Sequence, residues 1–190
     1  VKGFSYKGSE KSSFPTDYAF ITLDNFKEGQ GFKPKYSGIK SSRLKDEDFI
    51  QEGDVVIANT EQTKDARLLS TPALIFFPDD YKKTKGVFSH HVTKIIPKTD
   101  FLKYYLFFHF LYNQSIIANA YHTGTGVWAL DVNGMKKQYL ILSPEKNVIK
   151  DFSKLLQPLI QTFIKNQKEI IVLKKLRDSL IPKLISGDIR

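Results

Sequence analysis

Short apolar runs separated by turn signals recur along residues 1–148. Five of these runs are rich in strand-forming residues and predict β-strands at 18–23, 55–58, 73–77, 92–96 and 138–142. Between the last two, apolar residues at helical spacing predict a helix over 100–112, with Asp100 as its N-cap. Strands followed by helices, without a regular β-α alternation, favour an irregular α+β fold.

The pattern changes near Pro144, where a seven-residue repeat begins. Nine of the eleven a and d positions between Ile149 and Leu184 are apolar, which predicts a long C-terminal coiled-coil helix. Proline is tolerated in a first helical turn but disrupts a helix interior, so Pro158 predicts the helix start and Pro182 a break or kink. The chain therefore divides into a mixed domain at 1–148 and a helical region at 149–190.

The apolar seam of this helix is expected to drive dimerisation. A polar residue within such a seam usually sets the register of the pair. The predicted dimerisation residues are Leu159, Phe163, Asn166, Ile170 and Leu173. The alternative is a monomer in which the helix packs back on residues 101–120.

The charge is basic and grouped in blocks. The formal net charge is +9, with +4 on residues 1–148 and +5 on residues 149–190. Two blocks, 29–45 and 81–98, hold several basic residues and no acid. Such blocks suit a polyanionic partner, although each could also be a solvated loop. The residues expected to bind DNA through these blocks are Lys35, Lys40, Arg43, Lys82, Lys83 and Lys85.

Motifs for catalysis, cofactors and metals are missing. The chain has no cysteine, no glycine-rich phosphate loop and no apolar run near the roughly 20 residues of a membrane span. His90 and His91 are adjacent, so on a strand they would face opposite ways and chelate a metal poorly. We therefore expect no cofactor, no metal, no membrane contact and a place in the reducing cytoplasm.

Two polar segments carry side chains suited to reading bases. Residues 59–67 follow a predicted strand and offer amides for adenine and cations for guanine or phosphate. Residues 121–128 combine hydroxyls, glycines and aromatics. The candidate DNA-binding residues in these segments are Asn59, Gln62, Lys64, Arg67, His122, Thr123 and Thr125. By composition alone, both segments could be ordinary surface loops.

The end of the chain resembles the closing segment of the specificity subunits of type I restriction-modification systems. That family shows Leu-x-x-Leu-Arg-Asp, an apolar pair, Pro-Lys-Leu and then Ser-Gly-Asp-Ile. The matching positions are Leu173, Leu176, Arg177, Asp178, Pro182, Lys183, Leu184, Ser186, Gly187, Asp188 and Ile189. Upstream, Gly53-Asp54, the Gly-Thr-rich stretch at 122–130 and the apolar-Pro boundary at 141–144 also resemble the family in the expected order.

The resemblance implies a target recognition domain followed by a spacer helix, with no catalysis of its own. Its implied partners are double-stranded DNA, modification subunits that bind S-adenosylmethionine and methylate adenine, and a motor-nuclease subunit. A full specificity subunit has two such units, so one unit would be a half-subunit that dimerises or part of a longer chain. The alternatives are a coiled-coil interaction adaptor and a fragment of a DNA-modifying enzyme.

Overall fold

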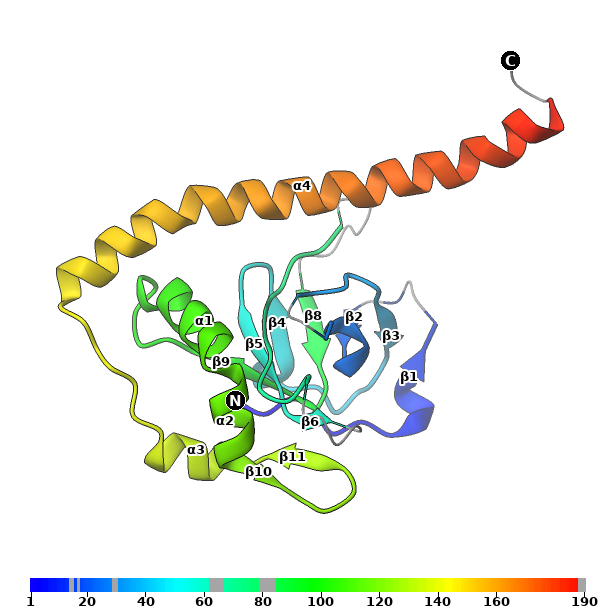
Figure 1. The fold of residues 1–190 in the computed structure, drawn as a ribbon. Helices are drawn as coiled ribbons and strands as arrows, with labels where there is room; N and C mark the ends of the chain where they lie inside the picture. Colours follow the sequence, from blue (N-terminus) through cyan, green and yellow to red (C-terminus); the bar gives the residue numbers. More distant parts are fainter. Residues whose placement is uncertain (14–15, 17, 29–30, 62–66, 79–84, 188–190) are drawn as a thin grey trace.

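The computed structural model describes all residues except 14–15, 17, 29–30, 62–66, 79–84 and 188–190. It has a mixed domain crossed by one long helix, α4 (Figure 1). The strands are β1 (Lys11–Ser12), β2 (Tyr18–Ile21), β3 (Ser37–Ile39), β4 (Phe49–Gln51), β5 (Val55–Ala58), β6 (Thr60–Glu61), β7 (Pro72–Leu74), β8 (Lys85–Phe88), β9 (Val92–Ile95), β10 (His122–Thr123) and β11 (Trp128–Leu130). The helices are α1 (Leu102–Tyr112), α2 (Gln114–Tyr121), α3 (Val132–Gln138) and α4 (Lys146–Ser186), with short 3-10 turns at Gly8–Glu10, Leu23–Asn25 and Asp46–Asp48. This arrangement confirms the predicted α+β class.

Two sheets build the centre of the domain. The first has the order β1-β3-β2-β8-β4, in which β2 and β8 run parallel and the other neighbours antiparallel. The second is antiparallel, with the order β7-β5-β9. Side chains from both sheets, such as Phe88 and Val56, share one core. This shared core ties the two sheets into a single unit.

Strand β5 shows why its sequence is apolar throughout. Val56 and Ala58 face the core shared by the two sheets, whereas Ile57 faces a second core formed with α1, α2 and α3. A strand covered on both faces reads as an unbroken apolar run instead of an alternating one. The strand predicted at 55–58 is therefore confirmed without a shift at either end.

The other predictions hold to different degrees. Strands at 18–21 and 92–95 and a helix at 102–112 are confirmed, and β7 spans 72–74 within the apolar run that continues to residue 77. The prediction of Asp100 as helix cap is wrong. Phe101 occupies the N-cap position in helical backbone geometry, and its side chain makes no capping hydrogen bond.

The strand predicted at 138–142 is also wrong. Residues 139–145 connect α3 to α4, and Leu140 and Leu142 are 89% and 81% exposed. No sheet edge pairs with this segment among the described residues. Its Leu142 carbonyl accepts a hydrogen bond from the Tyr105 hydroxyl instead. An apolar run thus predicted a strand where there is no neighbouring strand to pair with.

The long helix α4 begins at Lys146 and runs for 41 residues, about 60 Å, through both prolines. The predicted start at Pro158 is therefore wrong. Of the break or kink predicted at Pro182, the break is wrong, because the helix continues to Ser186. Both prolines lie on the exposed surface of the helix, where a carbonyl that loses its N–H donor can bond to water. The predicted stop is confirmed, because Gly187 adopts a left-handed φ of 79° and its N–H bonds to the Leu184 carbonyl.

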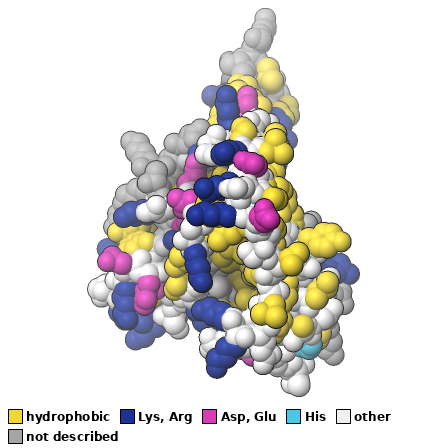
Figure 2. All heavy atoms as spheres, turned by 90° about the vertical axis from the view of Figure 1, so that its left-hand side faces the viewer, with side chains coloured by type: hydrophobic (Ala, Val, Ile, Leu, Met, Phe, Trp, Pro, Cys, Tyr) yellow, Lys and Arg dark blue, Asp and Glu magenta, His cyan; other side chains and the backbone are white. Residues whose placement is uncertain are grey.

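Helix α4 lies back across its own domain and also projects past it (Figure 1). Phe152 meets Phe108 of α1 edge to face, and Ile164 and Ile171 pack on the shared core. From Val172 to Ser186 every residue except Leu180 is exposed. Figure 2 shows hydrophobic side chains along one side of this projecting helix and Lys or Arg side chains along the other. The division at residue 148 stays a prediction.

Candidate nucleic-acid interface

A small third sheet brings together the two segments that the sequence singled out for reading bases. Its order is β10-β11-β6, and all its pairs are antiparallel. Thr60 and Glu61 of the first segment pair with Ala129 and Trp128 at the end of the second. Residues almost 70 positions apart in the chain therefore lie side by side. We call β6, β10, β11 and the 124–127 loop the ribbon.

The tip of the ribbon is tight and exposed. Gly124 has a φ of +95°, and a Cβ there would lie 2.5 Å from the Val127 carbonyl oxygen, so this turn requires glycine. Thr123 and Thr125 are exposed, and the Thr123 hydroxyl donates to the Ala129 carbonyl at 3.1 Å. The hairpin of β10 and β11 is two-stranded, and the major groove of B-DNA admits a two-stranded ribbon.

An aromatic stack supports one face of the ribbon. The His122 and Trp128 rings are nearly parallel, 15° apart, with centroids separated by 4.3 Å. Trp128 also packs against the second core, so its indole joins the exposed His122 to the interior. The sequence placed Trp128 within a candidate segment but did not single it out, although it is the one tryptophan in the sequence.

Buried polar groups hold strand β6 of the ribbon against the domain. Asn59 is only 3% exposed, and its side-chain amide donates to the His90 carbonyl at 3.3 Å. The Glu61 carboxylate is also buried and accepts the Leu68 N–H at 2.7 Å, which closes the base of the intervening loop. In this conformation Asn59 anchors the strand and does not present its amide at the surface.

Of the remaining candidates of the first segment, the structure describes only Arg67. Arg67 is exposed and forms an ion pair with Glu28 at 3.4 Å, in which both side chains are more than half exposed. Such a pair holds the guanidinium weakly and leaves it accessible. Gln62 and Lys64 lie outside the described residues.

The basic blocks lie on the five-stranded sheet and not on the ribbon. Lys35 and Lys40 flank β3 and Lys85 begins β8, and all three are exposed. Lys82 and Lys83 lie outside the described residues. The structure thus brings the ribbon candidates together but carries the described lysines on another element.

Arg43 has a structural partner. Its guanidinium donates to both oxygens of Glu10, at 3.0 and 2.5 Å, and lies 4.9 Å above the Phe4 ring. Hydrogen bonds from Arg43, and then from Ser41, lower the pKa of Glu10 to about 2. Arg43 therefore joins the N-terminal segment to the turn after β3, and we do not assign it to the interface.

His90 and His91 contact the start of β6, where the ribbon joins the domain. They sit in the turn between β8 and β9, not on a strand, and their rings lie 3.9 Å apart, so the expectation that they face opposite ways is wrong. His91 Nδ1 is 3.0 Å from the Thr60 hydroxyl at the start of β6. Burial lowers the pKa of both imidazoles, and the neighbouring His90 also lowers that of His91.

This pair predicts a loss of stability in mild acid. The unfolded chain binds protons at an ordinary histidine pKa of about 6.5, whereas the folded pair resists protonation. The free energy of unfolding is therefore expected to fall between about pH 7.5 and about pH 5.5, and to level off below the folded-state pKa. Urea unfolding at several pH values across this range measures the slope of the unfolding free energy against pH. His91→Gln should reduce the slope without abolishing it, because the pKa of His109 is also lowered by burial. An unchanged slope would contradict the prediction.

Other site types are not evident in the part of the chain that the structure describes. No group of three or more His, Cys, Asp or Glu residues there could hold a metal ion. Within the same residues, no helix is long and apolar enough to cross a membrane.

Comparison with known proteins gives one match in sequence and two in fold that bear on this interface. No family model matches the chain. A stretch of 67 residues is 42% identical to the type I restriction enzyme MjaIX specificity subunit of Methanocaldococcus jannaschii, covering 35% of this chain and 15% of that protein. Among solved structures, the chain matches the Type-I restriction-modification system S subunit from M. genitalium, with a TM-score of 0.61 and 12% identity over 99% of this chain and 43% of the other.

A second solved structure, of a type I R-M system, matches all of this chain and 43% of the other, with a TM-score of 0.57 and 12% identity. At this identity the two structures show a common fold and no more. The chain spans less than half the length of each of these proteins.

Proposed function

Since this chain is a relative of the type I restriction-modification specificity subunits, we propose that it recognises one half of a bipartite site in double-stranded DNA. The curated match and the shared fold confirm the family resemblance that the sequence motifs indicate. The observation that carries the DNA proposal is the pairing of β6 with β11, which unites two separate polar segments on one exposed ribbon. Base contacts specify a DNA sequence, and a ribbon can deliver them to the major groove.

Within this interface we assign two kinds of contact. Lysines of the two basic blocks meet phosphates, and residues of the two polar segments, 59–67 and 121–128, meet base edges. The proposed phosphate contacts are Lys35, Lys40, Lys82, Lys83 and Lys85. The proposed base contacts are Gln62, Lys64, Arg67, His122, Thr123 and Thr125. We leave Asn59 out because its amide is buried.

The partners follow from the proposed role. We propose that the chain directs modification subunits, and with them the motor-nuclease subunit, to the DNA site in the cytoplasm. As a half-subunit it would pair with a second copy through the exposed seam of α4. The seam favours one other candidate function, a coiled-coil interaction adaptor, because its apolar side chains are exposed from Leu159 to Leu184.

Reconstitution tests the proposal and the expected lack of catalysis together. The isolated chain is expected neither to cleave nor to methylate DNA, since the motifs for both reactions are missing from its sequence. With modification subunits and S-adenosylmethionine, it should direct methylation to one bipartite sequence, which sequencing of the modified DNA identifies.

Two outcomes contradict this function. Turnover by the pure chain would favour a fragment of a DNA-modifying enzyme. Reconstituted methylation that is the same with and without the chain, combined with no retention of the chain on duplex DNA at low salt, would favour the adaptor.

A further inference from the structure

Among the described residues, helix α4 meets α1 toward its N-terminal end and the shared core in its middle. Near its N-terminal end, Phe152 contacts α1, and Lys146 and Lys150 lie about 6 Å from the Phe101 ring. In its middle, Ile164 and Ile171 pack on the shared core. Beyond Ile171 the helix is exposed. The middle attachment therefore determines where the projecting end points.

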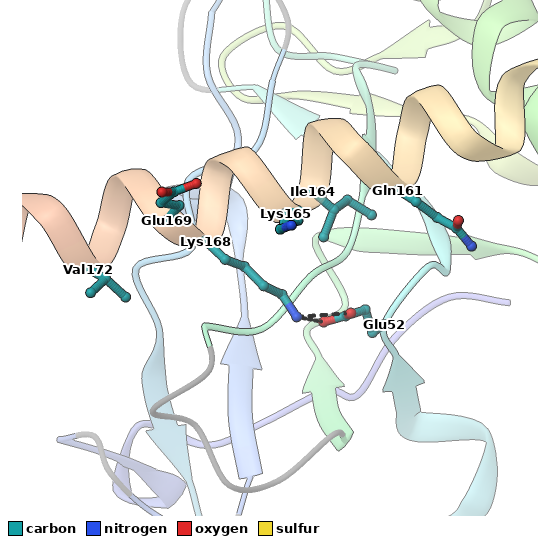
Figure 3. A pocket seen from close by; sticks show the side chains of 7 residues that line it. All are labelled: Glu52, Gln161, Ile164, Lys165, Lys168, Glu169 and Val172. Atoms are coloured by element: carbon teal, nitrogen blue, oxygen red, sulfur yellow. Dashed lines mark hydrogen bonds and ion pairs between the residues drawn. The ribbon is translucent and has the colours of Figure 1, made fainter.

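The middle attachment contains an ion pair that joins the helix to the domain (Figure 3). Lys168 Nζ lies 3.0 Å from Glu52 Oε1 and 2.9 Å from Glu52 Oε2. The Lys168 side chain is 18% exposed, so it lies partly out of water. The Phe77 N–H donates to Glu52 Oε2 at 3.0 Å and holds the carboxylate in place. Glu52 itself sits in the turn between β4 and β5, whose Gly53 N–H bonds to the Ile75 carbonyl.

The packing beside this ion pair is open. A cavity of about 640 Å³ lies between the helix and the turn, and Lys165, Glu169 and Val172 line it together with the pair. Apolar contact is non-directional, so Ile164 and Ile171 resist separation of the helix more than they resist rolling or sliding. A charged hydrogen bond with a held acceptor has a defined geometry. Among the contacts of the described residues, the ion pair is thus one that favours a single orientation of the helix.

We propose that Lys168 and Glu52 form a latch that sets the direction of α4 relative to the recognition domain. The inference rests on the proposed function in one respect: in a two-fold assembly this direction sets the distance between the two DNA half-sites. Glu52 and Lys168 are then positioning residues, which determine the preferred spacer length and touch no base.

The first experiment measures the direction of the helix without DNA. The chain has no cysteine, so Ser9→Cys and Ser179→Cys accept a spin-label pair on the domain and on the projecting helix. Labelled protein is diluted with unlabelled protein, so that only distances within one chain are measured. The Glu52→Gln variant keeps an oxygen for the Phe77 N–H but loses the charge. We expect a single narrow distance distribution in the parent chain and a broader or shifted one in Glu52→Gln and Lys168→Met.

Lys165→Met is the matched control, since Lys165 lines the same cavity and forms no described ion pair with Glu52. It is expected to keep the parent distribution. An unchanged distribution in both latch variants overturns the latch.

The second experiment measures spacer preference in the reconstituted complex. Binding is compared over duplexes that differ only in the number of base pairs between the half-sites. Partly exposed ion pairs contribute up to about 1 kcal/mol, so Glu52→Gln should reduce the discrimination between spacers about two- to fivefold. Binding to a single half-site should stay at the parent level. If the distances respond and the spacer preference does not, the link to spacing is wrong. If the parent complex does not discriminate between DNA sequences, the proposed function fails, and the distance experiment still decides the latch.

Discussion

Replacing Phe163 and Ile170 with glutamate is expected to convert a dimer of this chain into a monomer. Phe163 is 53% and Ile170 41% exposed in the single chain, although both occupy core positions of the seven-residue repeat. Burying such a side chain contributes about 1.5–3 kcal/mol. With Leu159 and Leu173, which are also exposed, the row is long enough to drive association.

The geometry of α4 leaves most of this row exposed. Ile164, Lys168 and Ile171, which contact the sheets, fall at the b and f positions of the repeat, and Phe152, which contacts α1, falls at a d position near the start of the row. The apolar row falls at a and d, on another face of the helix. Packing of the helix on its own domain and dimerisation through the seam are therefore compatible, since different parts of the helix serve the two contacts. An antiparallel two-fold pair would place the recognition domains at opposite ends of the rod.

Sedimentation at tens of micromolar decides the question. The control variant Gln157→Glu/Ser179→Glu adds the same charge at exposed positions off the seam and should stay dimeric. Circular dichroism should show equal helix content in both variants. A parent chain that is already a monomer at these concentrations, unchanged by the seam substitutions, would refute the self-assembled dimer.

The sequence predicted those elements whose burial produces a recognisable pattern of apolar residues. β5 is buried on both faces, and an unbroken apolar run records this. The long helix appears in the sequence as a heptad pattern. Its start was mispredicted at Pro158, because an exposed proline destabilises a helix less than a buried one would and the helix runs through it. The segment at 138–142 looked like a strand because apolar composition says nothing about whether a neighbouring edge exists.

The candidate site could be predicted in part for a similar reason. Polar, glycine-rich composition marked the two loops, but only pairing between strands far apart in the sequence brings Thr60 beside Ala129. Burial of Asn59 depends on the His90 turn, which is also distant in sequence. Long-range contacts of this kind leave no local pattern, so the sequence named the two segments that meet in the ribbon and could not separate anchoring residues from exposed ones.

A clear division between ribbon and lysine variants is expected in DNA binding. Arg67→Ala and Thr125→Ala should each cost about 1–3 kcal/mol on the cognate duplex and little on a random one, because base contacts carry the sequence information. Lys40→Ala should weaken binding to both duplexes alike. It should also reduce the slope of log affinity against log salt by about one, since one phosphate contact releases about one counterion.

The salt slope separates these roles even when affinities change by similar amounts. Lys174→Ala is the control, since it removes an equal charge from the exposed, projecting part of α4. It should leave both the cognate preference and the salt slope near the parent values. If Arg67, Thr125 and Lys40 variants behaved identically on cognate and random duplexes, the ribbon would not read bases. The pairing of β6 with β11 would then be a feature of the fold alone, because a surface that contributes only charge discriminates no sequence.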